Sequence, residues 1–96
     1  MPKYLIEREL PGAGDLSRDE LQGISQKSVE VLDSMAGRAQ WLETFVTDDK
    51  LFCVYIADDE AAVREHATAG GFPCNAVSRV ATIIDPTTAE SSLARL

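Results

Sequence analysis

Four side chains in this 96-residue sequence have the chemistry to bind a metal ion: Glu7, Glu43, Cys53 and His66. Carboxylate oxygens and a thiolate can hold a borderline divalent cation, and imidazole suits nickel, zinc or copper. The chain as a whole favours cations, because nine Lys and Arg residues against sixteen Asp and Glu residues give a net charge of −7. We therefore predict a divalent metal ion as a partner, and we assign no catalytic residue.

Each candidate also has a purely structural interpretation. Glu7 can form an ordinary ion pair with Arg8 or Arg79. Cys53 on a core strand can act as a small apolar residue. His66, the single histidine, falls on or beside the buried stripe of a predicted helix, where a histidine is often a hydrogen-bonded packing residue. The sequence alone leaves both interpretations open.

Six elements must position these side chains. Hydrophobic periodicity predicts helices between residues 17 and 37 and over 60–69, and strands over residues 3–9, 39–47, 51–57 and 75–84. Ser17 and Glu20 have the spacing of a capping box at the start of the first helix. The order β-α-β-β-α-β predicts an α+β, ferredoxin-like fold, with an antiparallel sheet and two helices on one face. Right-handed crossovers place the first and third strands side by side in the middle.

The metal prediction requires that Glu7, Glu43 and Cys53 lie together on the face of the sheet that the helices leave open. Glu7 and Glu9 belong there, because a buried unpaired carboxylate is costly. In the third strand Phe52, Val54 and Ile56 form the better core set, so the alternate residues face outward. We therefore expect the open face to contain the following residues: Leu5, Glu7, Glu9, Trp41, Glu43, Phe45, Leu51, Cys53 and Tyr55.

This open face would expose a large apolar patch, formed by Trp41, Phe45, Leu51 and Tyr55. Such patches usually mark interfaces, so we predict a homodimer joined sheet to sheet. The ferredoxin-like domain is expected to span residues 1–86. Residues 87–96 are mostly polar, and we expect them to form a C-terminal tail that is flexible or docks on a partner subunit.

Composition argues against several classes of protein. An acidic chain lacks the clustered cations with which proteins bind nucleic acids and anionic membranes. No apolar run approaches the roughly 20 residues of a membrane span, and residues 1–4 lack the pattern of a secretion signal. Two cysteines, Cys53 and Cys74, make no disulfide framework, so we predict a cytoplasmic chain with free thiols. Without a nucleotide-binding loop or a hydrolase motif, we expect no organic cofactor and a binding protein rather than an enzyme.

Several short segments, taken in their order along the chain, resemble one family. They are Ile6-Glu7-Arg8, Trp41, Phe52-Cys53-Val54-Tyr55, Arg64-Glu65-His66-Ala67 and Gly71-Phe72-Pro73. Over residues 1–86 the chain resembles the family of small bacterial ferredoxin-like proteins typified by an actinobacterial nickel-binding protein. The resemblance implies a dimer and surface binding of nickel, and hence a small metal-binding protein that acts as a nickel buffer or sensor.

A second hypothesis rests on the fold alone. Dimeric ferredoxin-like proteins resemble the cofactor-free monooxygenases and related barrel-dimer enzymes, which hold a substrate between sheet and helices. The analogy implies a small-molecule pocket lined by Trp41, Tyr55, His66 and Arg79. A cavity of about 300 Å³ or more among these residues would favour it.

Overall fold

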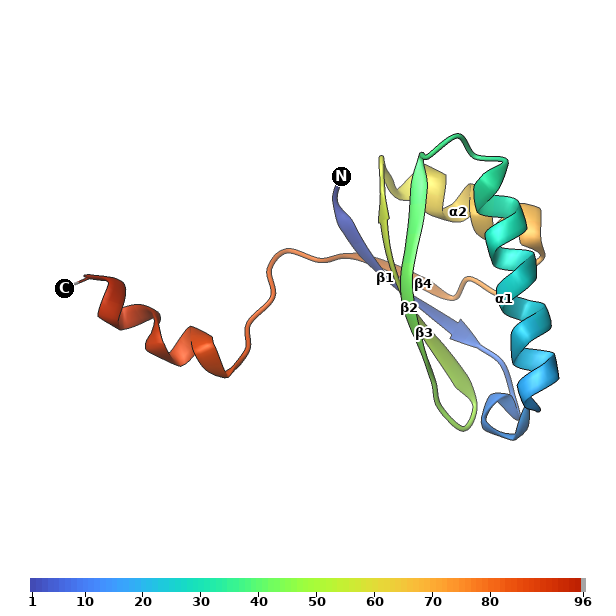
Figure 1. Ribbon diagram of the computed structural model, residues 1–96, viewed down its shortest axis with the longest axis horizontal. Coiled ribbons are helices and arrows are strands. Elements are labelled where there is room, and N and C mark those ends of the chain that lie inside the picture. The colour runs from blue at the N-terminus through green and yellow to red at the C-terminus, as the bar shows by residue number, and fades with distance from the viewer. Residues whose placement is uncertain (96) are drawn as a thin grey trace.

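The computed structural model describes residues 1–95, with side chains up to Glu90. Two helices lie on one side of a four-stranded sheet, and a C-terminal segment extends from the opposite side (Figure 1). The predicted α+β, ferredoxin-like order is confirmed. The elements are β1 (Lys3–Glu9), the 3₁₀ helix η1 (Ala13–Asp15), α1 (Arg18–Asp33), β2 (Ala39–Val46), β3 (Lys50–Ala57), α2 (Glu60–Gly70), β4 (Ala76–Arg79) and the 3₁₀ helix η2 (Pro86–Arg95).

The strands lie in the order β2-β3-β1-β4, and all neighbours are antiparallel. The first and third strands therefore occupy the middle, as predicted. In their register, Ile6 lies opposite Cys53 and Glu7 lies opposite Phe52. Because side chains alternate across a strand, this register places Ile6 and Cys53 on one face and Glu7 and Phe52 on the other.

Local hydrogen bonds fix the ends of both helices. Ser17 Oγ accepts from the Glu20 backbone N–H at 3.1 Å, and Glu20 Oε1 accepts from the Ser17 N–H at 2.9 Å. The predicted capping box is thus present. Asp59 caps α2 by accepting from Ala62 N at 2.8 Å. This helix ends at Gly70 and is capped by Gly71, whose φ of 69° is left-handed and favours glycine.

The fourth strand is much shorter than predicted. We expected it over residues 75–84, but β4 covers only Ala76–Arg79. Its partner is the reason: β4 pairs with β1, and the last bond runs from Val80 N to Lys3 O at 2.8 Å. Pro2 precedes Lys3 and has no N–H. The ladder ends where β1 begins, and the next residues leave the sheet.

We call the side of the sheet beneath the helices the covered face. Its buried side chains include Tyr4, Ile6, Arg8, Leu51, Cys53, Tyr55 and Ala57. The prediction that Leu51, Cys53 and Tyr55 lie on the open face is therefore wrong. Polar pairing explains the difference, because the Tyr55 hydroxyl lies near Ser28 of α1, while Arg8 reaches the carbonyl of Pro73 at 2.6 Å.

The opposite side of the sheet, the open face, carries Leu5, Glu7, Glu9, Glu43, Phe45, Phe52, Val54 and Ile56. The placement of Leu5, Glu7, Glu43 and Phe45 is as predicted. Trp41 is not there, because a β-bulge between Trp41 and Glu43 shifts the register. Trp41 pairs with Tyr55 and Glu43 pairs with Val54, so the two side chains lie on opposite faces.

The open face is only partly shielded within one chain. Leu5 is 40% exposed and Phe45 is 55% exposed. The chain after β4 leaves on this side of the sheet (Figure 1) and exposes Ile83 and Ile84 by 64% and 76%. Within residues 1–95, no helix is both long and apolar enough to span a membrane.

Candidate ligand pocket

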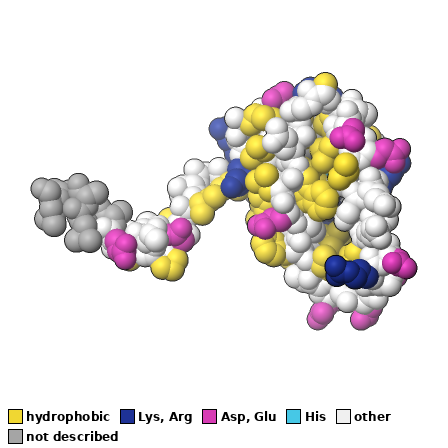
Figure 2. Space-filling model, in the orientation of Figure 1, with side chains coloured by type: hydrophobic (Ala, Val, Ile, Leu, Met, Phe, Trp, Pro, Cys, Tyr) yellow, Lys and Arg dark blue, Asp and Glu magenta, His cyan; other side chains and the backbone are white. Residues whose placement is uncertain are grey.

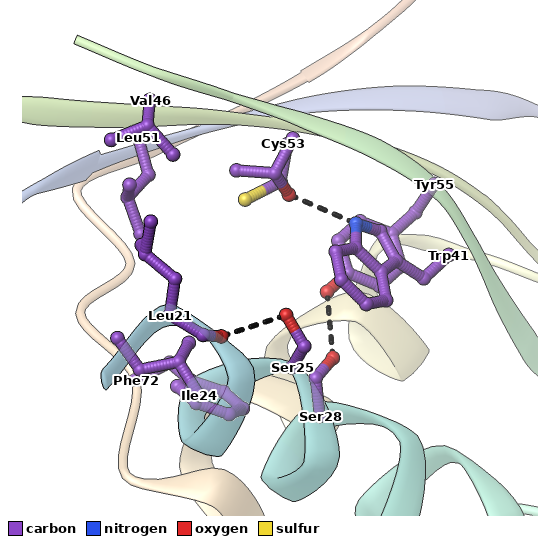
Figure 3. Close-up of a pocket in the computed structure, with 11 residues that line it drawn as sticks. Leu21, Ile24, Ser25, Ser28, Trp41, Val46, Leu51, Cys53, Tyr55 and Phe72 are labelled. Carbon is purple, nitrogen blue, oxygen red and sulfur yellow. Dashed lines mark hydrogen bonds between the residues drawn. The ribbon is translucent and has the colours of Figure 1, made fainter. Parts of the chain in front are cut away.

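A cavity of about 150 Å³ lies between α1 and the covered face of the sheet. Hydrophobic side chains gather on the surface where α1 runs beside β2 (Figure 2), and the close-up shows side chains from both layers around the cavity (Figure 3). None of the lining residues is charged. They are Leu21, Ile24, Ser25, Ser28, Trp41, Thr44, Val46, Leu51, Cys53, Tyr55 and Phe72.

A chain of polar groups closes one end of the cavity. Ser28 Oγ lies 3.2 Å from His66 Nε2 and 3.4 Å from the Tyr55 hydroxyl. The His66 ring lies against the rings of Tyr55 and Phe72, with centroid distances of 5.1 and 5.4 Å. The serine thus joins α1 to β3 and α2, and the three side chains hold one another in place.

Burial sets the protonation states in this polar chain. Desolvation lowers the pKa of His66 below its ordinary value of 6.5, so the imidazole is neutral at pH 7. Burial also raises the pKa of Tyr55 above its ordinary value of 10.0, although the contact with Ser28 acts the other way. Both side chains therefore act as neutral hydrogen-bonding groups at physiological pH.

The bulge in β2 supplies the aromatic wall of the cavity. Trp41 turns toward the helices, and its Nε1 donates to Thr44 Oγ1 at 2.9 Å (Figure 3). Thr44 pairs with Cys53 on β3 and also faces the cavity. Without the extra residue, Trp41 and Glu43 would lie on the same face.

The sheet divides the four predicted metal ligands. Glu7 lies on the open face and accepts from Lys50 Nζ at 2.5 Å, while Glu43 is exposed on the same side. Cys53 and His66 are buried on the covered side, 3% and 1% exposed. The four residues therefore do not form one site. Across the described part of the chain, no three His, Cys, Asp or Glu side chains are grouped so that they could hold a metal ion.

Three of the four predicted pocket residues lie at the cavity. Trp41 and Tyr55 line the cavity, and His66 lies directly behind Tyr55 and Ser28. Arg79 is exposed on β4 and is not part of the lining. The cavity is also about half of the volume that we expected. Cys53 and Cys74 are both free, as predicted.

Three important residues were not among the sequence candidates. Ser28 interrupts the apolar stripe of α1, and a polar residue in such a stripe is a signal for a buried hydrogen bond. Arg8 alternates with Tyr4 and Ile6 along β1, which placed it on their face. Phe72 follows the end of α2, and no local pattern predicts that its ring turns back to the cavity.

Comparisons with known proteins agree with the fold. A family model described as nickel responsive protein SCO4226-like matches residues 4–80. The crystal structure of SCO4226 from Streptomyces coelicolor A3(2) is similar in fold, with a TM-score of 0.73 at 12% sequence identity. The match covers 85% of this chain and 99% of that chain. A comparison with curated proteins found no match.

Proposed function

Because the chain belongs to the SCO4226-like family of nickel responsive proteins, we propose that it is a small cytoplasmic nickel-binding protein that acts as a buffer or sensor. The family match is the observation that carries this proposal. The net charge of −7 supports it, since an acidic surface concentrates cations. The two free cysteines suit a reducing compartment.

The described residues restrict where nickel can bind. Cys53 is buried and accepts a hydrogen bond from Arg8, while His66 is buried against Ser28. Neither can reach the open face. The accessible donors there are carboxylates, and one chain does not bring three of them together within residues 1–95. Glu9 lies opposite Lys50 and Glu43 lies opposite Val54, too far apart in one chain to share an ion. We therefore propose that nickel binds between two copies, with Glu9 or Glu43 of one chain and carboxylates of the other as ligands.

A homodimer joined through the open face would bring such carboxylates together. Leu5 and Phe45 are exposed there, and Phe52, Val54 and Ile56 are only half-buried. Apolar surface of this kind is stabilised when a partner covers it. A second copy is the proposed partner, because it presents the same apolar surface.

We propose that the C-terminal tail docks on the partner subunit. The chain after β4 leads to the tail on the side of the open face (Figure 1), and the tail lies beyond the residues that the family model matches. Ile83 and Ile84 lead into it and are exposed in the single chain. Truncation after Val80 should therefore weaken the dimer, which sedimentation velocity can measure, and an unchanged dissociation constant would contradict docking.

Calorimetry with untagged protein tests nickel binding, with zinc and copper as competitors. We expect the paired variant Glu9→Gln/Glu43→Gln to lose at least tenfold in nickel affinity, because it removes whichever of the two carboxylates binds the ion. Cys53→Ser should keep the affinity, because Cys53 lies beneath the helices. Absence of binding to the wild-type chain would overturn the proposal. An equal loss of nickel affinity in Cys53→Ser would place the nickel site on the covered side of the sheet instead.

The cavity favours a second function, the binding of a small organic molecule. Its walls are mainly apolar, and hydroxyl groups of Ser28 and Tyr55 lie together at one end. Ligand pockets commonly combine an apolar lining with a few fixed polar groups. Protein-observed NMR with small aromatic compounds tests this function, and shifts confined to cavity residues would support it. A spectrum unchanged by every compound would contradict it.

A further inference from the structure

Arg8 is a buried cation without an anionic partner among the described residues. Its side chain is 2% exposed. Nη1 donates to the Pro73 carbonyl at 2.6 Å and Nε donates to Cys53 Sγ at 3.4 Å. Nη2 is buried, with no hydrogen-bond partner in the described residues. Burying a charge in this way is costly unless something compensates it.

The arginine lies directly behind the cavity. Its guanidinium carbon is 5.5 Å from the centre of the Phe72 ring, and its Nε contacts Cys53. Both Phe72 and Cys53 line the cavity. No lining residue is charged, and Arg8 contacts the lining from behind through Cys53 and Phe72. The buried guanidinium therefore places one positive charge next to the pocket, although the chain as a whole carries −7.

The size of the cavity limits what could compensate this charge. A cavity of about 150 Å³ matches the apolar cavity volume that holds one benzene-sized molecule. The apolar walls suit one ring or a short branched chain. The Tyr55 hydroxyl and Ser28 Oγ can donate to an oxygen atom placed beside them.

We propose that the pocket binds a small monocarboxylate with an apolar body of about one ring, its carboxylate directed to the Arg8 end. This proposal rests on the second function above and adds the ligand class. The anion would compensate the buried guanidinium and accept hydrogen bonds from the neighbouring hydroxyl groups. A neutral amide of the same shape would keep the apolar contacts and one accepting oxygen, but it would lack the charge that compensates the guanidinium.

Trp41 provides a direct readout, because it is the single tryptophan and lines the cavity. We would titrate metal-free, untagged protein with benzoate and with benzamide, its neutral analogue of nearly the same shape, and follow Trp41 fluorescence. The wild-type chain should bind benzoate about tenfold more tightly than benzamide, because the charge acts at short range in a poorly solvated site.

Matched variants assign this preference to Arg8. Arg8→Met should remove the preference for benzoate and leave benzamide binding unchanged. Arg79→Met removes an exposed arginine and should leave both affinities unchanged. Ser25→Phe fills the cavity from α1 and should abolish binding of both compounds. Circular dichroism checks that each variant is folded.

The outcomes separate the two proposals. Failure of both compounds to bind the wild-type chain would reject the pocket as a binding site, and with it the ligand class. Equal binding of benzoate and benzamide would reject the anionic class alone. This comparison needs only the wild-type chain, so it remains decisive if Arg8→Met does not fold. A preference for benzoate that survives in folded Arg8→Met would also overturn the role of Arg8.

Discussion

The two faces of the sheet differ in a way that hydrophobicity alone does not explain. The covered face buries polar side chains, including Arg8 and Tyr55, and Tyr55 contacts Ser28 and His66 from the helices. The open face carries Phe52 and Ile56, which remain half-buried. The helices therefore cover the face on which the Tyr55 hydroxyl finds a partner in Ser28, while Arg8 Nη2 on that face has no partner among the described residues. The open face keeps apolar side chains exposed between its carboxylates, and we propose that a second copy covers them.

Truncation of a core residue should have the largest effect. Ile6 is fully buried on the covered face, whereas Leu5 is 40% exposed on the open face. Ile6→Ala should cost about 2–5 kcal/mol in the free energy of unfolding, because it removes apolar contacts and leaves a cavity. Leu5→Ala should cost less than about 1 kcal/mol in a dilute, monomeric sample. Urea denaturation measures both, and equal losses would remove the distinction between the faces.

A charge on the open face should disrupt the proposed dimer. Phe45→Glu should weaken self-association by about 2–3 kcal/mol, because it places a carboxylate in an apolar interface. Val29→Glu is a matched control, since Val29 is 46% exposed on α1. Sedimentation equilibrium measures the dissociation constants of both variants. If Val29→Glu dissociates the dimer and Phe45→Glu does not, the interface lies on the helices.

Loss of one hydroxyl from the covered face should have a smaller effect. Tyr55→Phe removes the hydroxyl that contacts Ser28 but keeps the ring against His66. We expect a loss of about 1 kcal/mol in the free energy of unfolding, which is typical of one buried hydrogen bond. Thermal or urea unfolding measures it. An unchanged free energy of unfolding would show that the contact between Tyr55 and Ser28 does not stabilise the packing of the covered face against the helices.

The pH dependence of stability should show a modest contribution from His66. Its pKa is lowered in the folded chain, so the unfolded chain binds the proton more readily. Stability should therefore be complete above the ordinary value of 6.5 and fall as the pH decreases below it. Between about pH 7 and 5, the urea midpoint of His66→Gln should change less with pH than that of the wild-type chain. An identical slope in the wild-type chain and the variant would contradict a neutral, buried His66.

The sequence predicted the element order and the placement of β1 and β3 because those signals are local or follow from chain crossover. The capping box at Ser17 and Glu20 and the carboxylates of β1 are examples. The face of β3 could not be predicted from hydrophobicity, because Phe52, Val54 and Ile56 are the more apolar set and still face outward. The face of β3 is set by contacts of Tyr55 with Ser28 and His66, which are distant in the sequence.

The candidate site was predicted in part. Trp41 and Tyr55 were recognised as pocket residues, and they meet across the β2–β3 pair. The bulge that separates Trp41 from Glu43 has no glycine or proline to indicate it. Arg8 was missed as a functional residue because an arginine in a strand is usually expected to reach solvent or a carboxylate. Its position depends on Pro73 and Cys53, which are distant in sequence.

The mass of the untagged chain in solution tests the central claim, that the open face joins two copies. Multi-angle light scattering at micromolar concentration should give twice the chain mass of 10.4 kDa, and Phe45→Glu should return the particle to 10.4 kDa. A wild-type particle of 10.4 kDa, both without and with nickel, would contradict the account.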